Sequence, residues 1–168
     1  MSCCSMEDTH SEDHHQTKSK FAQLKFDSRE AKSQDFKAEI PVGSVLVKNS
    51  KLVAQSHNQS IRTNDPTAHA EIQALQRAGS VLNNYRLLDC ALYVTLEPCA
   101  MCLGALMHSR IDKIVFGAFD TKSGVCGSCA SLHSADFFNH NISVTGGILE
   151  KKCGNLLVDF FQSKRSKK

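Results

Sequence analysis

The chain has 168 residues, 41% of them hydrophobic, which suits one domain with a single sizeable core. No apolar run approaches the roughly 20 residues that a membrane-spanning helix needs, so we expect no membrane contact. The first 20 residues lack the apolar stretch of a secretory signal, and we therefore expect a cytoplasmic protein. The eight cysteines then do not indicate a disulfide framework, because such a framework needs an oxidising compartment.

The formal net charge is +3, but the charges are unevenly distributed along the chain. The first 15 residues carry four acidic side chains and no Lys or Arg, so residues 16–168 carry +7, four more than the whole chain. A basic body that ends in Lys164-Arg165-Ser166-Lys167-Lys168 suits a polyanionic partner such as a nucleic acid. A solubilising terminus explains the tail equally well, so charge alone does not decide between the two.

The first third of the chain begins with a polar segment and continues with segments whose apolar residues have helical or strand spacing. Residues 1–20 have almost no core-forming side chains and are expected to be a disordered tail, and residues 21–168 a single domain. Phe21 to Lys37 has an imperfect helical spacing of apolar residues, which predicts a surface helix. Two short runs, Ile40 to Val47 and Lys51 to Ser56, are separated by a polar turn and predict a β-hairpin.

A helix is predicted next, with Asp65 as its N-cap and a proline at its first helical position. It runs to about Ala78 and is expected to stop at Gly79, a residue that suits a helix C-terminus. Ala91 to Leu96 is almost wholly apolar, as expected of a strand that is covered on both faces. A second helix follows that strand and runs to about Ser109.

The last third of the chain predicts one more strand, a loop and a closing helix. These are Lys113 to Phe119, the Gly-containing segment Asp120 to Cys129, and Leu149 to Gln162. This order of elements implies an α/β fold, with helices on the faces of a mixed sheet. In such sheets ligands bind at the C-terminal ends of the strands, where the helices begin.

Two short motifs together offer a metal site: Thr67-Ala68-His69-Ala70-Glu71 and Glu97-Pro98-Cys99-Ala100-Met101-Cys102. They supply one imidazole, two thiolates and a carboxylate that is not needed as a ligand. Zinc is held tetrahedrally by such N and S donors, and a catalytic site leaves one position open for water. A His-x-Glu followed at a distance by Pro-Cys-x-x-Cys is the signature of the zinc-dependent nucleobase deaminases.

The spacing within the motifs fits one ion. Cys99 and Cys102 are three residues apart and therefore lie on the same face of a helix. Both thiols are near a helix N-terminus, whose partial positive charge favours the thiolate form. His69 and Glu71 are two apart and would point to nearly opposite sides deep inside a helix. We therefore expect the metal to lie off the end of the helix.

The cysteines also allow other interpretations. Cys126 and Cys129 could complete a structural zinc ribbon with the two motif cysteines, but the intervening gap of 23 residues exceeds the usual 15–20 or so. A ribbon would also leave His69 and Glu71 without a role. Cys126 and Cys129 could instead form a redox pair or bind a second metal, although small apolar space-filling is favoured.

From about Phe21 to Arg165 the chain resembles the bacterial tRNA-specific adenosine deaminases. The zinc signature alone is shared by many deaminases, and the flanking runs are what point to this branch. The matching stretches are Glu39-Ile40-Pro41-Val42-Gly43, residues 65–72, Asn84-Tyr85-Arg86-Leu87, residues 92–102, Ser109-Arg110-Ile111, Phe116-Gly117-Ala118, Asp120 with Lys122 and Gly124, Asn139-His140 and Gly146-Gly147-Ile148-Leu149.

The resemblance implies a cytidine-deaminase-like three-layer fold, with a five-stranded mixed sheet and helices on both faces, in a homodimer. It implies hydrolysis of the wobble adenosine of a tRNA anticodon to inosine, with one zinc ion per chain. The zinc ligands would be His69, Cys99 and Cys102, and the proton shuttle Glu71. Asn58 and Asp120 would contact the flipped nucleotide, although Asn58 also suits a turn and Asp120 a loop cap.

Competing activities use the same catalytic residues. A deaminase of free nucleobases, nucleosides or cytosine is the first alternative, and a eukaryotic-type catalytic subunit that needs a partner chain is another. The basic body and the branch-specific flanks disfavour the first alternative, and the bacterial-type flanks disfavour the second. Departures from the family are few: Ser44 replaces the usual Ala, Ser123 the usual Thr, and the family does not need cysteines at 126 and 129.

Overall fold

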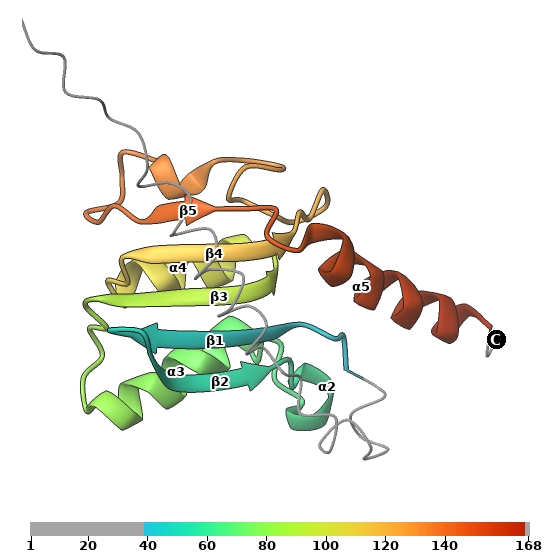
Figure 1. The fold of residues 1–168 in the computed structure, drawn as a ribbon, viewed down its shortest axis with the longest axis horizontal. Helices are drawn as coiled ribbons and strands as arrows, with labels where there is room; N and C mark the ends of the chain where they lie inside the picture. The colour runs from blue at the N-terminus through green and yellow to red at the C-terminus, as the bar shows by residue number, and fades with distance from the viewer. Residues whose placement is uncertain (1–38, 167–168) are drawn as a thin grey trace, which may run out of the picture.

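The computed structural model describes residues 39–166 and is built around a five-stranded sheet (Figure 1). The strand order is β2-β1-β3-β4-β5, and the sheet is mixed. The tail expected at 1–20 and the helix expected at 21–37 lie outside the described residues and remain predictions.

The expected hairpin is formed by β1 (Gly43–Lys48) and β2 (Lys51–His57), which pair antiparallel. Asn49 and Ser50 join them with φ angles of 48° and 61°. Two consecutive positive φ angles give a two-residue turn whose twist matches that of the strands. A tight hairpin therefore forms one edge of the sheet.

The remaining strands are β3 (Cys90–Leu96), β4 (Lys113–Ala118) and β5 (Ser143–Thr145). β3 pairs antiparallel with β1 and parallel with β4, and β4 pairs parallel with β5. The three residues of β5 were not located in the sequence, because a partly exposed strand of this length has no readable alternation. The predicted five-stranded mixed sheet is confirmed.

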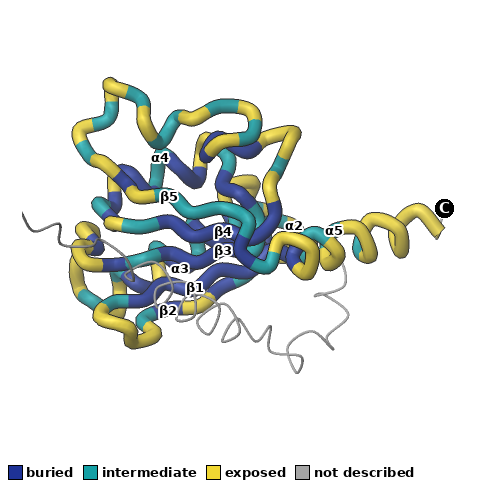
Figure 2. Tube along the Cα trace, turned by 45° about the horizontal axis from the view of Figure 1, so that its top comes forward, coloured by how far each residue is buried: buried dark blue, intermediate teal, exposed yellow. Residues whose placement is uncertain are grey.

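Helices cover both faces of this sheet. α3 (Ala70–Leu82) and α4 (Ala100–His108) lie on one face, where their apolar side chains meet inward side chains of the strands such as Leu92, Ile114 and Phe116. α5 (Glu150–Arg165) starts on the other face, where Cys153 packs with Tyr93 and Val115. Two short helices, α2 (Ser60–Thr63) and η3 (Leu132–Ser134), lie in the connections. Figure 2 shows that the central strands β1, β3 and β4 are largely buried.

The helix predicted from Asp65 to about Ala78 corresponds to α3, and both of its predicted ends were wrong. Asp65 does not cap it, because its Oδ1 accepts hydrogen bonds from the backbone N–H and hydroxyl of Thr67 and closes a local turn instead. The helix continues through Gly79 and ends at Leu82, where Asn83 takes the left-handed conformation with φ 48°. A capping Asn replaced the glycine that the sequence had suggested.

The closing helix extends further than expected, and much of it is exposed. α5 runs to Arg165 rather than to about Gln162, and Leu149 precedes it with φ 57°. Of its apolar residues Cys153 is buried, whereas Leu156 and Phe161 are each 46% exposed. Figure 1 shows the helix projecting from the sheet, with its C-terminal half away from the strands. No helix among residues 39–166 combines the length and apolarity needed to cross a membrane.

Candidate active site

Both predicted motifs lie at helix starts next to one another. His69 is the N-cap of α3 and Cys99 the N-cap of α4, each with extended backbone (ψ 156° and 172°). β3 ends at Leu96 and delivers the chain directly into the second motif. Pro98 precedes α4 and so removes no helical hydrogen bond. The motifs therefore occupy the C-terminal end of β3, on the face that α3 and α4 cover.

The structure brings the three proposed metal donors together. His69 Nδ1 is 3.4 Å from Cys102 Sγ and 3.8 Å from Cys99 Sγ, and all three donor atoms lie within 4.8 Å of one another. Zn–S bonds of about 2.3 Å and Zn–N bonds of about 2.0 Å put tetrahedral donors roughly 3.5–3.8 Å apart. The observed spacings are thus those of a three-ligand metal site, and His69, Cys99 and Cys102 could hold a metal ion.

The two thiols differ in their surroundings. Hydrogen bonds from Cys102 and His69 lower the pKa of Cys99 to about 4, so this thiol is ionised at neutral pH. The bond to Cys99, together with burial, raises the pKa of Cys102. The bond to the Cys99 thiolate raises the pKa of His69. One thiolate is therefore ready for a cation, and the second proton is released when the metal binds.

Glu71 is the second residue of α3 and only 4% exposed. Desolvation raises the pKa of its carboxyl, because the charged form is disfavoured in a buried setting. It does not belong to the three-donor group. A carboxyl that has a raised pKa and lies beside a candidate metal site is suited to taking up and returning a proton.

Asn58 lies directly after β2 and is 8% exposed. Its Oδ1 accepts a 2.8 Å hydrogen bond from the N–H of Ala70, the first residue of α3. Its own N–H donates to the carbonyl of Val42 at 3.1 Å. Because Oδ1 is engaged with the helix start, the side-chain NH₂ is the group that can address a ligand. Asn58 thus fixes the position of the residue between His69 and Glu71.

Asp120 follows β4 and is half-buried. Its Oδ1 accepts hydrogen bonds from the backbone N–H of Lys122 at 2.9 Å and of Ser123 at 3.3 Å, which is the loop-capping role considered for it. The loop that it opens reaches the second motif, where Gly124 forms an isolated antiparallel bridge with Cys99. Asp120 is therefore held at the beginning of a loop that lies against a metal donor.

The motifs assign no role to the side chain of Glu97, whereas in the structure hydrogen-bond donors surround it. This side chain is 2% exposed and accepts hydrogen bonds from the backbone N–H groups of Asp120, Cys126 and Ser128. Desolvation would raise the pKa of its carboxyl, but these bonds together with one from the Ser128 hydroxyl hold the pKa below its usual value. The available signal was an acidic residue at the end of an almost wholly apolar strand.

The two unusual cysteines do not build a ribbon. Cys126 is buried, and desolvation raises the pKa of its thiol to about 12. Cys129 is exposed, and its thiol donates to the carbonyl of Thr121 at 3.2 Å. Across residues 39–166 the ligand group comprises His69, Cys99 and Cys102, and neither Cys126 nor Cys129 joins it.

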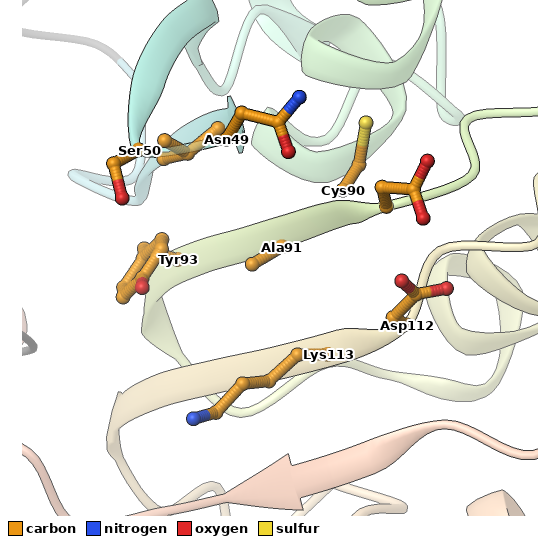
Figure 3. Close-up of a pocket in the computed structure, with 9 residues that line it drawn as sticks. Asn49, Ser50, Cys90, Ala91, Tyr93, Asp112 and Lys113 are labelled. Carbon is orange, nitrogen blue, oxygen red and sulfur yellow. The ribbon is translucent and has the colours of Figure 1, made fainter. Parts of the chain in front are cut away.

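A separate hollow lies at the opposite end of the sheet and is not part of this site (Figure 3). Cys90 and Lys113 begin β3 and β4 there, whereas the metal donors lie beyond the end of β3. Its lining is Val47, Asn49, Ser50, Asp89, Cys90, Ala91, Tyr93, Asp112 and Lys113.

The fold and the donor group define a deaminase. The family model of the MafB19-like deaminases matches residues 15–165, most of the chain. The tRNA-specific adenosine deaminase of Bacillus subtilis (strain 168) is 44% identical over 140 residues, 83% of this chain and 87% of that protein. The enzyme of the same name from Haemophilus influenzae is 49% identical over 131 residues, 77% and 76% of the two chains. The chain belongs to the tRNA-specific adenosine deaminase family, which confirms the resemblance inferred from its motifs.

Two solved structures have the same fold. A structure from studies of A-to-I editing by tRNA:A34 deaminases at the wobble position superposes with a TM-score of 0.75 and 36% identity. It is matched over 83% of this chain and 99% of its own. A guanine deaminase from Nitrosomonas europaea shares the fold, with a TM-score of 0.58 and 24% identity over 71% of each chain.

Proposed function

We propose that this protein hydrolyses the wobble adenosine of a tRNA anticodon to inosine. The observation that carries the proposal is that the structure combines three candidate metal donors with a buried carboxylate, Glu71. Glu71 is two residues from His69, which is one of the donors. The substrate follows from relatives named tRNA-specific adenosine deaminase and from the structural similarity to a tRNA:A34 deaminase.

Zinc is the proposed metal, one ion per chain, with His69, Cys99 and Cys102 as its ligands. One imidazole and two thiolates are a donor set that zinc prefers, and three protein ligands leave a fourth position for water. When bound, zinc lowers the pKa of a coordinated water so that hydroxide is available near neutral pH. Glu71 would take one proton from the attacking water and deliver it to N1 of the adenine while the water oxygen bonds to carbon 6. It would then pass the proton of the new hydroxyl group to the amine, so that the bond between carbon 6 and nitrogen breaks. Ammonia leaves, and carbon 6 gains a keto group in place of the amine.

Two further residues are proposed to hold the extruded nucleotide. Asn58 offers its side-chain NH₂, because its Oδ1 is engaged with Ala70. Asp120 offers the oxygen of its carboxylate that takes no part in the bonds to Lys122 and Ser123. Because the target base lies in an RNA loop, turning it out of the stack costs little.

The proposed partners are a tRNA anticodon stem-loop and a second copy of the chain, and the proposed location is the cytoplasm. The positive charge of residues 16–168 supports contact with RNA phosphates. Lys164 and Arg165 add two cations to the exposed last turn of α5. The homodimer rests on the family resemblance, and light scattering of the purified protein tests it.

The deciding experiment incubates the purified, zinc-loaded protein alone with an anticodon stem-loop that carries a wobble adenosine. Inosine formation, measured by nucleoside analysis, is the expected result. Parallel incubations with free adenosine, cytidine and guanine are expected to release no ammonia. Ammonia from a free base or nucleoside, with none from the stem-loop, would favour the alternative deaminase. Activity on RNA only after addition of a second chain would favour a catalytic subunit.

A further inference from the structure

Glu97 is a buried carboxylate that neither binds the metal nor faces the base in the proposed mechanism. It lies between the end of β3 and Cys99 and is 2% exposed. Ionised carboxylates are almost never buried to this extent without several partners, because they lose their hydration. Its surroundings therefore indicate what it does.

Four donors converge on this side chain. The N–H groups of Cys126 and Ser128 lie 2.8 Å and 3.0 Å from Oε1, and the N–H of Asp120 lies 3.0 Å from Oε2. The hydroxyl of Ser128 also donates to Oε2. The donors come from both ends of the segment 120–128, so a single carboxylate closes this loop.

The same loop is attached to the metal motif. Val125 N–H donates to the carbonyl of Pro98 at 3.1 Å, and Gly124 bridges to Cys99. A Cβ on Gly124 would collide with the Glu97 carboxylate and lie 2.6 Å from the carbonyl oxygen of Asp120. The loop is therefore wrapped around the carboxylate so closely that a methyl group has no space.

We propose that Glu97 is a positioning residue that fixes Asp120 relative to the metal ligands. It holds the loop that begins with Asp120 against the segment that contains Cys99. The inference rests on the proposed function, in which Asp120 contacts the nucleotide. Because Asp120 Oδ1 is bonded to backbone N–H groups of the same loop, the direction of its carboxylate follows the loop that Glu97 holds.

The role requires a carboxylate. Each of the four hydrogen bonds to the Glu97 side chain comes from a donor, and an ionised acceptor forms stronger hydrogen bonds than a neutral one. In Glu97→Gln the shape is retained, but an NH₂ group would face an N–H or a hydroxyl donor. The variant therefore loses part of the network without leaving a cavity.

The first test does not need a substrate. Hydrogen exchange of the Cys126 and Ser128 amides is measured in the zinc-loaded wild type and in Glu97→Gln, together with zinc content. We expect exchange at least about tenfold faster in the variant, the effect of losing one charged hydrogen bond, at an unchanged one zinc per chain. Unchanged exchange would overturn the proposal. Loss of zinc would also overturn it, because Glu97 would then support the metal ligands rather than Asp120.

The second test asks whether Glu97 acts through Asp120. On the wobble-adenosine stem-loop, Glu97→Gln and Asp120→Asn are each expected to lower kcat/KM by about tenfold to a hundredfold. The double variant should be within about twofold of Asp120→Asn alone, because two residues in one network are non-additive. Independent, multiplicative losses would contradict the proposal.

Ile114→Val is the control for general destabilisation, because Ile114 is fully buried near the start of β4, away from the loop. It should lower the melting temperature. Any effect that it has on kcat/KM should be independent of the effect of Asp120→Asn. If Glu97→Gln does not fold, Ser128→Ala is used instead, because it removes only the hydroxyl donor. Its loss of kcat/KM should be smaller and should likewise be non-additive with that of Asp120→Asn. A wild type that forms no inosine would refute the proposed function, while the exchange measurement would still decide whether Glu97 holds the loop.

Discussion

Glu71 and His69 lie two positions apart at the start of α3, yet substitutions at the two residues are expected to have different effects on zinc content and turnover. Glu71 is outside the donor group, so Glu71→Gln should retain zinc. Turnover should fall by about two to four orders of magnitude, the contribution typical of general acid–base catalysis. Single-turnover inosine formation and metal analysis of the same preparation measure both quantities.

His69→Ala is the matched variant, since it removes a donor and should lose zinc together with activity. Zinc loss in Glu71→Gln would show that the carboxylate supports the metal and not the proton transfer.

The thiols of Cys126 and Cys129 are expected to differ sharply in reactivity. Burial raises the pKa of Cys126 to about 12, so below that pH its thiolate, the reactive form, is scarce in the folded state. Cys129 is exposed. Brief treatment with iodoacetamide at pH 8, followed by peptide mass spectrometry, should label Cys129 and leave Cys126 unmodified. Equal labelling of both in the folded protein would mean that the loop opens readily.

At the scale of elements, Asn58 connects the end of β2 to the beginning of α3. Asn58→Ala loses the bond to Ala70 and should lower the free energy of unfolding by about 1–2 kcal/mol, the cost of an unpaired buried donor. Asn58→Asp retains an acceptor for that bond but loses the NH₂, so it should be more stable than Asn58→Ala and still deaminate poorly. Thermal unfolding and kcat/KM on the stem-loop separate the two roles.

If Asn58→Asp were as active as the wild type, the side-chain NH₂ would have no part in holding the nucleotide. Asn58 would then serve only the start of α3.

The sequence predicted the hairpin and the apolar strands because each is encoded by a few adjacent residues, and it predicted the donor group because two short motifs have a recognisable joint pattern. Helix limits were harder, since Asp65 suits a local turn as well as an N-cap, and only the fold decides between them. The partners of Glu97 could not be foreseen, because they lie 23 to 31 residues further along the chain. Contacts of this separation depend on how β3 and β4 are placed side by side.

At the scale of the whole molecule, the charge distribution should control affinity for RNA. Binding of the stem-loop should weaken as salt rises, with a linear dependence of log K on log salt concentration, because bound phosphates release counterions. Removal of residues 164–168 should reduce the steepness of that dependence and weaken binding moderately. Fluorescence titrations between low and physiological salt measure both.

Deamination of a saturating short substrate is the control for this truncation and should be unchanged. A flat salt dependence in the intact chain would contradict docking through phosphates.

The donors at the starts of α3 and α4 are 30 and 33 residues apart along the chain. A bound ion would therefore act as a cross-link that closes a long loop, and in the denatured chain such a link restricts conformational freedom. Treatment with a chelator should lower the melting temperature, and returning zinc should restore it. The metal would then decide how long each molecule survives in the cell as well as whether it can react, because an empty chain would unfold and be degraded sooner than a loaded one.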